Sequence, residues 1–70
     1  MPWVETPTSS TIARFDYDKG RKVLVVEFKQ GSRYNYFDVP EGQYEAMKRA
    51  PSTGQFLAQN IKNKYRYARA

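Results

Sequence analysis

Three segments rich in β-branched and aromatic residues follow one another at short intervals, and this pattern limits the possible folds more than any other feature. The segments span residues 11–17, 22–28 and 33–39, with Gly20 in the first gap and Gly31 in the second. Runs of this composition, bounded by glycine, are typical of β-strands. Because the gaps are too short for a crossover connection, the strands are expected to form antiparallel hairpins.

The second gap predicts the register of its hairpin. If residues 29–31 are a three-residue loop, Gly31 takes the left-handed backbone conformation that such a loop requires. Cross-strand partners then follow from counting back along both strands. The predicted pairs are Val26–Tyr34, Leu24–Tyr36 and, as an ion pair on the other face, Glu27–Arg33.

The first gap allows two registers. An even loop around Gly20 places Phe15 opposite Leu24, whereas a three-residue loop places Arg14 there. We favour the even loop because it gathers apolar side chains on one face. The predicted apolar face carries Ala13, Phe15, Tyr17, Leu24, Val26, Phe28, Tyr34 and Tyr36, and the opposite face carries Ile12, Arg14, Asp16, Val23, Val25, Glu27, Arg33, Asn35 and Phe37.

The hydrophobic period changes after residue 39, which indicates helices. Pro40 suits the first turn of one helix, and Pro51 ends it. Ser52, with Gln55 three residues later, forms a capping box for a second helix. In that helix the apolar residues recur every four positions, at Leu57, Ile61 and Tyr65.

The predicted fold class is therefore α+β: a three-stranded antiparallel meander followed by two helices packed on one face, in the order βββαα. Residues 1–9 are expected to be a flexible N-terminal arm from which Trp3 docks back on the domain. Residues 10–67 form the single domain and 68–70 a C-terminal tail. With no apolar run of about 20 residues and no leader-like start, we expect a cytoplasmic protein that does not contact membranes.

The composition excludes several classes of chemistry. The chain has no cysteine and no histidine, so disulfides, Cys or His metal sites, a cysteine nucleophile and a histidine base are ruled out. Each carboxylate has a turn, ion-pair or helix-start role, and no phosphate-binding glycine loop is present. We therefore expect no catalytic residues, no metal and no cofactor.

Tyr34 and Tyr36 share one face of their strand because they are two residues apart. In a chain of 70 residues the core needs its aromatic side chains, so both rings are predicted to lie at least partly under the helices, with hydroxyls at the rim. The alternative is an open platform on which RNA bases stack.

Positive charge is concentrated at the end of the chain. Residues 46–70 carry a net charge of +6 without any Asp or Glu, whereas residues 1–45 carry −1. Such asymmetry indicates a polyanionic partner such as a nucleic acid, although a solvated basic tail gives the same pattern. The candidate binding residues are Lys48, Arg49, Lys62, Lys64, Arg66 and Arg69 for phosphates, and Tyr67 for stacking on a base. The binding surface is therefore predicted to lie mainly on a basic C-terminal helix.

Two further surfaces are candidates. Ser52, Thr53 and Gly54 begin the second helix, where free N–H groups can hold a phosphate; a plain helix cap explains the same residues. The alternative function is a protein–protein interaction module that uses an exposed edge strand or the outer face of the sheet. The outer-face patch consists of Val23, Val25 and Phe37.

The order of residues resembles the KTSC domain, a short module named for its occurrence at the C-terminus of some lysyl-tRNA synthetases and found alone in small bacterial and phage proteins. The resemblance covers about residues 10–67, and Pro51 is unusual for the pattern. It implies a non-enzymatic module, for which the synthetase context suggests RNA binding. The matching residues are Ser10, Tyr17, Asp18, Leu24, Val26, Phe28, Gly31, Tyr34, Tyr36, Val39, Pro40, Tyr44, Ala50, Ser52, Gly54, Phe56, Ile61, Lys62 and Tyr65.

Overall fold

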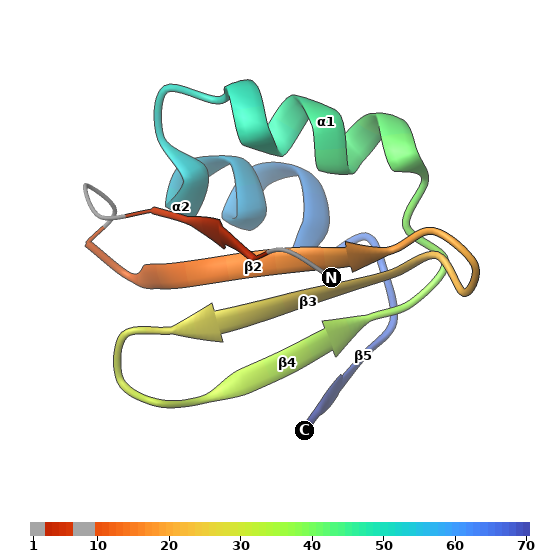
Figure 1. The fold of residues 1–70 in the computed structure, drawn as a ribbon, viewed down its shortest axis with the longest axis horizontal. Helices are drawn as coiled ribbons and strands as arrows, with labels where there is room; N and C mark the ends of the chain where they lie inside the picture. Colours follow the sequence, from red (N-terminus) through yellow and green to blue (C-terminus); the bar gives the residue numbers. More distant parts are fainter. Residues whose placement is uncertain (1–2, 7–9) are drawn as a thin grey trace.

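A single antiparallel sheet, with strands in the order β1-β2-β3-β4-β5, carries two helical segments (Figure 1). The computed structural model describes residues 3–6 and 10–70. It confirms the α+β class, with an antiparallel sheet and two helices. The elements are β1 (Val4–Glu5), β2 (Ile12–Asp18), β3 (Val23–Phe28), β4 (Arg33–Tyr36), α1 (Glu41–Arg49), α2 (Thr53–Phe56), which continues as the π-helix η1 (Leu57–Ile61), and β5 (Tyr67–Arg69).

The β3–β4 hairpin has the predicted register. Gly31 has a φ of 104°, and its N–H donates to the Phe28 carbonyl at 2.9 Å. The guanidinium of Arg33 lies 2.8 Å from the Glu27 carboxylate, as the register requires. The confirmed cross-strand pairs are Leu24–Tyr36, Val26–Tyr34 and Glu27–Arg33.

The β2–β3 hairpin keeps the predicted face, but its register differs by two residues. Phe15 lies opposite Val26 rather than Leu24, and the loop spans residues 19–22. The Asp18 carboxylate organises this loop by accepting the N–H groups of residues 20 and 21 at 3.0 and 3.2 Å. In this loop Lys22 has the left-handed backbone conformation, with a φ of 57°, whereas Gly20 does not.

Ile12 is buried in the core, so the prediction that it lies on the outer face is wrong. The register between β2 and β3 shifts between Ile12 and Arg14, where Ala13 is the additional residue of a β-bulge. An extra residue reverses the alternation of faces beyond it. Ile12 is therefore 0% exposed.

The expected three-stranded meander is wrong at its first edge, where β1 extends the sheet. Val4 pairs with Phe15, and the Thr6 hydroxyl donates to the Ile12 carbonyl at 2.6 Å. This strand uses part of the segment that the sequence suggested was a loose arm; residues 1–2 and 7–9 lie outside the described residues. Pairing along β2 occupies backbone groups that a free edge strand would expose.

The expectation is also wrong at the other edge, where the chain returns to pair with β4. The second helix ends at Ile61, so the predicted basic C-terminal helix is absent. The Phe37 N–H donates to the Arg66 carbonyl and the Ala70 N–H to the Arg33 carbonyl, both at 2.8 Å. The chain here forms the strand β5 instead of continuing the helix. This strand includes residues 68 and 69, which were predicted to belong to a tail.

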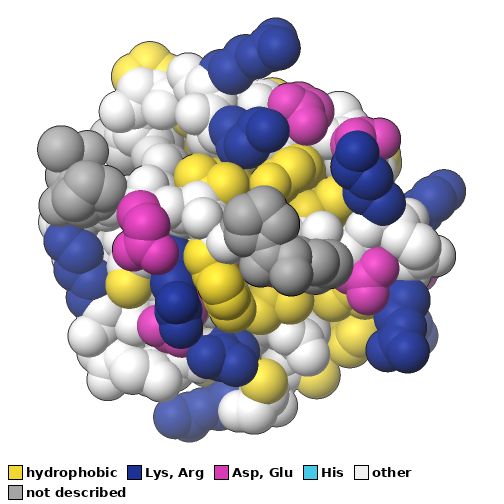
Figure 2. Space-filling model, in the orientation of Figure 1, with side chains coloured by type: hydrophobic (Ala, Val, Ile, Leu, Met, Phe, Trp, Pro, Cys, Tyr) yellow, Lys and Arg dark blue, Asp and Glu magenta, His cyan; other side chains and the backbone are white. Residues whose placement is uncertain are grey.

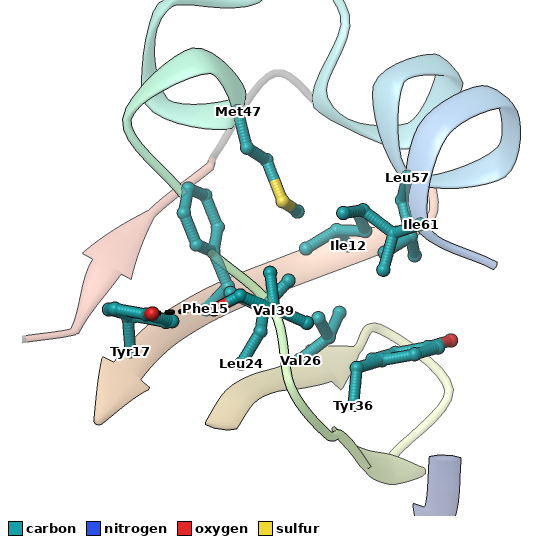
Figure 3. Close-up of a cluster of buried hydrophobic side chains, with 10 residues drawn as sticks. All are labelled: Ile12, Phe15, Tyr17, Leu24, Val26, Tyr36, Val39, Met47, Leu57 and Ile61. Carbon is teal, nitrogen blue, oxygen red and sulfur yellow. Dashed lines mark hydrogen bonds between the residues drawn. The ribbon is translucent and has the colours of Figure 1, made fainter. Parts of the chain in front are cut away.

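Both helices pack on the inner face of the sheet, and their buried side chains meet those of the strands (Figure 3). The Tyr17 hydroxyl donates to the Val39 carbonyl at 2.5 Å, and the Tyr44 ring stacks on Tyr17 with centroids 5.0 Å apart. The buried residues are Ile12, Phe15, Tyr17, Leu24, Val26, Tyr36, Val39, Met47, Leu57 and Ile61.

Truncating Tyr36 should destabilise the domain far more than truncating Tyr67. Tyr36 is 3% exposed, whereas Tyr67 is 56% exposed. We expect Tyr36→Ala to lower the free energy of unfolding by ~3–5 kcal/mol and Tyr67→Ala by about 1 kcal/mol or less. Urea denaturation measures both values, and equal losses would contradict the packing described.

Alkaline pH should weaken the fold through two tyrosines. Burial raises the pKa of Tyr36, with smaller contributions from Tyr67 and Tyr34; burial also raises the pKa of Tyr17, with added effects of Glu41 and Asp18. Their stabilisation is fully present below the unfolded pKa of about 10 and is lost as pH rises through the folded pKa values.

The matched test compares the wild-type protein with Tyr36→Phe. We expect the free energy of unfolding of the variant to fall less steeply above pH about 10, because one titrating group is gone. Identical slopes for the two proteins would show that the Tyr36 hydroxyl titrates alike in the folded and unfolded states.

Candidate nucleic-acid interface

A row of three tyrosines crosses from β4 to β5 on the inner face of the sheet. Tyr67 lies opposite Tyr36, and its ring centroid is 5.7 Å from the centroids of both Tyr36 and Tyr34. Burial decreases along the row: Tyr36 is in the core, Tyr34 is half-buried and Tyr67 is exposed. The helices cover the beginning of the row and leave its end open to solvent.

Tyr34 and Tyr36, which share one face of β4, therefore differ in burial: Tyr36 lies in the core and Tyr34 lies at its margin. Tyr36 belongs to the core, and its hydroxyl points away from the other buried side chains (Figure 3). Tyr34 packs edge-to-face on Phe28, with centroids 5.7 Å apart and planes at 87°, and keeps part of its surface accessible. Both rings support the exposed Tyr67.

These rings line a groove of about 200 Å³ between the sheet and the end of the second helix. Lys62, directly after η1, brings a cation to this groove, and Gln30 brings an amide. Among the residues that the structure describes, no acidic side chain lines it. The lining residues are Phe28, Gln30, Tyr34, Tyr36, Lys62 and Tyr67.

Sequence reasoning missed Phe28 and Gln30 as site residues. Phe28 was assigned to the apolar face and Gln30 to a turn. The β3–β4 register already placed Phe28 near Tyr34, which is the signal that could have found it. Lys62 lines the groove from the opposite side. Predicting this would have required the position of the helix end, which the β3–β4 register does not give.

The basic residues after Lys62 lie on two faces of β5. Arg69 pairs with Tyr34 and therefore shares the inner face with Tyr67. Its guanidinium donates to the Ser32 hydroxyl at 3.3 Å. Arg66 lies on the outer face, with its guanidinium 5.8 Å from the centre of the Phe37 ring. The structure thus separates Arg66 from the groove, and Lys64 lies in the exposed turn before it.

Lys48 and Arg49 belong to a different part of the surface. They end α1, and the Lys48 ammonium contacts the Glu45 carboxylate at 3.3 Å and the Tyr44 ring at 4.9 Å. Lys48 does not line the tyrosine groove but a separate cleft, which it shares with Glu5. Arg49 is exposed.

The predicted phosphate-binding residues line that separate cleft. Ser52 caps the second helix by accepting the Gln55 N–H at 3.4 Å, as the capping box predicted. Thr53 and Gly54 lie beside it, and Lys48 is within the same lining. Glu5 also lines this cleft, and its negative charge would repel a phosphate there. The observed arrangement therefore favours the plain helix cap.

The Glu27 carboxylate, on the outer face, already forms ion pairs. Hydrogen bonds from Arg33 and Arg14 lower the pKa of Glu27. The Arg14 guanidinium lies 4.3 Å from the centre of the Trp3 ring and that of Arg33 lies 5.3 Å from it, so Trp3 docks on the domain as expected. These contacts hold Glu27 away from the tyrosine groove.

On the face shown in Figure 2, Asp and Glu side chains lie among the Lys and Arg side chains. Within residues 3–6 and 10–70, no group of three or more Asp or Glu residues is arranged to hold a metal ion. No helix in this part of the chain has the length and apolar character needed to cross a membrane.

Comparison with known proteins gives a consistent assignment. The model of the KTSC domain matches residues 8–65. The lysine–tRNA ligases of Nostoc punctiforme and Trichormus variabilis are each 39% identical over 61 residues, which are 87% of this chain and 11% of each ligase. The chain thus spans about a tenth of the length of these enzymes.

Two smaller proteins match over nearly their whole length. A protein of Tsukamurella paurometabola is 33% identical over 58 residues, which cover 87% of it. The crystal structure of a KTSC domain protein from Yersinia pestis superposes with a TM-score of 0.89 and 30% identity, covering 99% of this chain and 96% of that one. The chain belongs to the KTSC domain family, whose members include small proteins of this size.

Proposed function

We propose that this domain is a non-enzymatic module that binds RNA through its C-terminal basic segment, which we define as Lys62, Lys64, Arg66 and Arg69, together with Tyr67. The observation that carries the proposal is the exposed Tyr67 ring beside a groove that Lys62 also lines. An exposed aromatic ring close to cations is the combination that single-stranded nucleic acid requires.

The arginines of this segment contact neutral groups: Arg66 lies over the Phe37 ring, and Arg69 donates to the Ser32 hydroxyl. Among the ion pairs of the described residues, none involves Lys62, Lys64, Arg66 or Arg69. Other basic side chains are engaged, as in the contacts of Arg14 and Arg33 with Glu27 and of Lys19 with Glu41. Unpaired cations gain more from a polyanion, because no existing ion pair has to be broken first.

RNA rather than DNA is proposed from the similar proteins. Lysine–tRNA ligases carry a region 39% identical to this chain, and tRNA is part of their name. A shared module of this size in such enzymes supports a role in contacting RNA, which also fits the cytoplasmic location expected for the chain. The ligase activity that their name states belongs to the whole enzymes, of which the matched region is a small part.

A protein partner is the second candidate, and the edge of β5 favours it. Phe37 and Arg33 bond to residues 66 and 70, so Tyr67 and Arg69 direct their backbone N–H and C=O groups away from the sheet. An added strand could pair there. Such a complex would tolerate salt, which distinguishes it from a complex with RNA.

Removing positive charge from the basic segment should weaken RNA binding and its salt dependence. We expect Lys62/Lys64/Arg69→Ala to lose at least about tenfold in affinity and to reduce the slope of log K against log salt by up to about 2, because each phosphate contact on a single strand contributes about 0.7. Arg66 is left in place because it packs over Phe37. The measurement is fluorescence anisotropy of labelled single-stranded RNA, duplex RNA and tRNA at low and near-physiological salt.

The matched control removes the same charge elsewhere. Lys19, Arg21 and Lys29 are exposed residues of the two hairpin loops, and Lys19/Arg21/Lys29→Ala also removes three positive charges. We expect this variant to bind nearly as well as the wild type. Equal losses in both triple variants would indicate attraction by net charge alone, and no binding of any RNA at low salt would contradict the proposal.

A further inference from the structure

We infer that the groove beside Tyr67 receives one unpaired base of the bound RNA. The inference rests on the proposed function, because it assumes that RNA is the ligand. It adds the form of RNA that is recognised and the residues that recognise it. Three features of the molecule support it: the size of the groove, the chemistry of its lining and the distribution of charge around β5.

The size of the groove suits a single planar ring system. Its volume is about 200 Å³, below the 300–1,000 Å³ typical of sites for drug-sized molecules. A second hollow of about 290 Å³ adjoins it and shares three of its lining residues: Phe28, Gln30 and Lys62. A nucleotide adjacent to the bound one therefore has a continuous path along the protein past Lys62.

The lining supplies each contact that an unpaired base uses. Tyr67, which is 56% exposed, presents a ring for stacking, while Tyr34 and Tyr36 support it from the sheet. The Gln30 amide and the Tyr36 hydroxyl can both donate and accept hydrogen bonds at the edge of a base. The Lys62 ammonium, at the same groove, meets the adjoining phosphate.

The charge around β5 favours a single strand that crosses the edge of the sheet. Arg69 lies on the inner face with Tyr67, and Arg66 lies on the outer face over Phe37. A flexible single strand can place one base in the groove and its next phosphates near either arginine. In a duplex the faces of the bases are stacked and closed to side chains, so Tyr67 could not reach them.

Lys62 and Lys64 provide a matched pair for testing this inference. Both carry one positive charge and both are exposed, but only Lys62 lines the groove. With a short labelled single-stranded RNA as the probe, we expect Lys62→Ala to reduce affinity several-fold more than Lys64→Ala. The same strand annealed to its complement should bind more weakly and should not distinguish the two variants.

Tyr67 tests the stacking contact. We expect Tyr67→Ala to weaken binding of the single strand about five- to a hundredfold, and Tyr67→Phe to retain binding because the ring is kept. Urea denaturation of each variant verifies that it is folded at the assay temperature. If Tyr67→Ala is unfolded there, the Lys62 and Lys64 comparison decides.

The outcomes separate the inference from the function on which it rests. Single-stranded RNA that binds the wild type, with equal losses for Lys62→Ala and Lys64→Ala and no loss for a folded Tyr67→Ala, overturns the groove and leaves RNA binding in place. Preference for the duplex also overturns the groove. A wild-type protein that binds neither RNA overturns the proposed function itself.

Discussion

The pairing of β5 with β4 is the interaction on which the proposed site depends. Two backbone hydrogen bonds of 2.8 Å, from Phe37 to Arg66 and from Ala70 to Arg33, hold the end of the chain against the sheet. They place Tyr67 beside Tyr36, beyond the cover of the helices. Without this pairing the ring and the cations around it would belong to an unstructured basic tail, and no groove would form.

Local signals were enough to predict the central part of the fold. Gly31 gave the β3–β4 register and the Glu27–Arg33 ion pair, and Ser52 gave the start of the second helix. These features depend on neighbours a few residues apart, where turn geometry and capping chemistry leave few alternatives. Their success explains why the helix-covered face was correctly placed on the tyrosine side.

The outer strands and the bulge depend on contacts that local sequence does not reveal. β1 and β5 are two and three residues long, too short for a periodic signal, and β5 forms only where β4 offers an edge. Charge asymmetry drew attention to the end of the chain, but helical spacing through Tyr65 predicted a helix there. As a result the site was expected on a helix surface, whereas Lys62, directly after η1, and Tyr67, on β5, line the same groove.

The most direct test of this account is an NMR titration of the isotopically labelled domain with short single-stranded RNA, following backbone amides and tyrosine ring protons. The account predicts that the largest shifts cluster at Phe28, Tyr34, Lys62 and Tyr67, with contacts between Tyr67 ring protons and protons of a base. Shifts centred instead on the Ser52–Gly54 cleft, on the outer face around Trp3, or spread evenly over all lysines and arginines would contradict it.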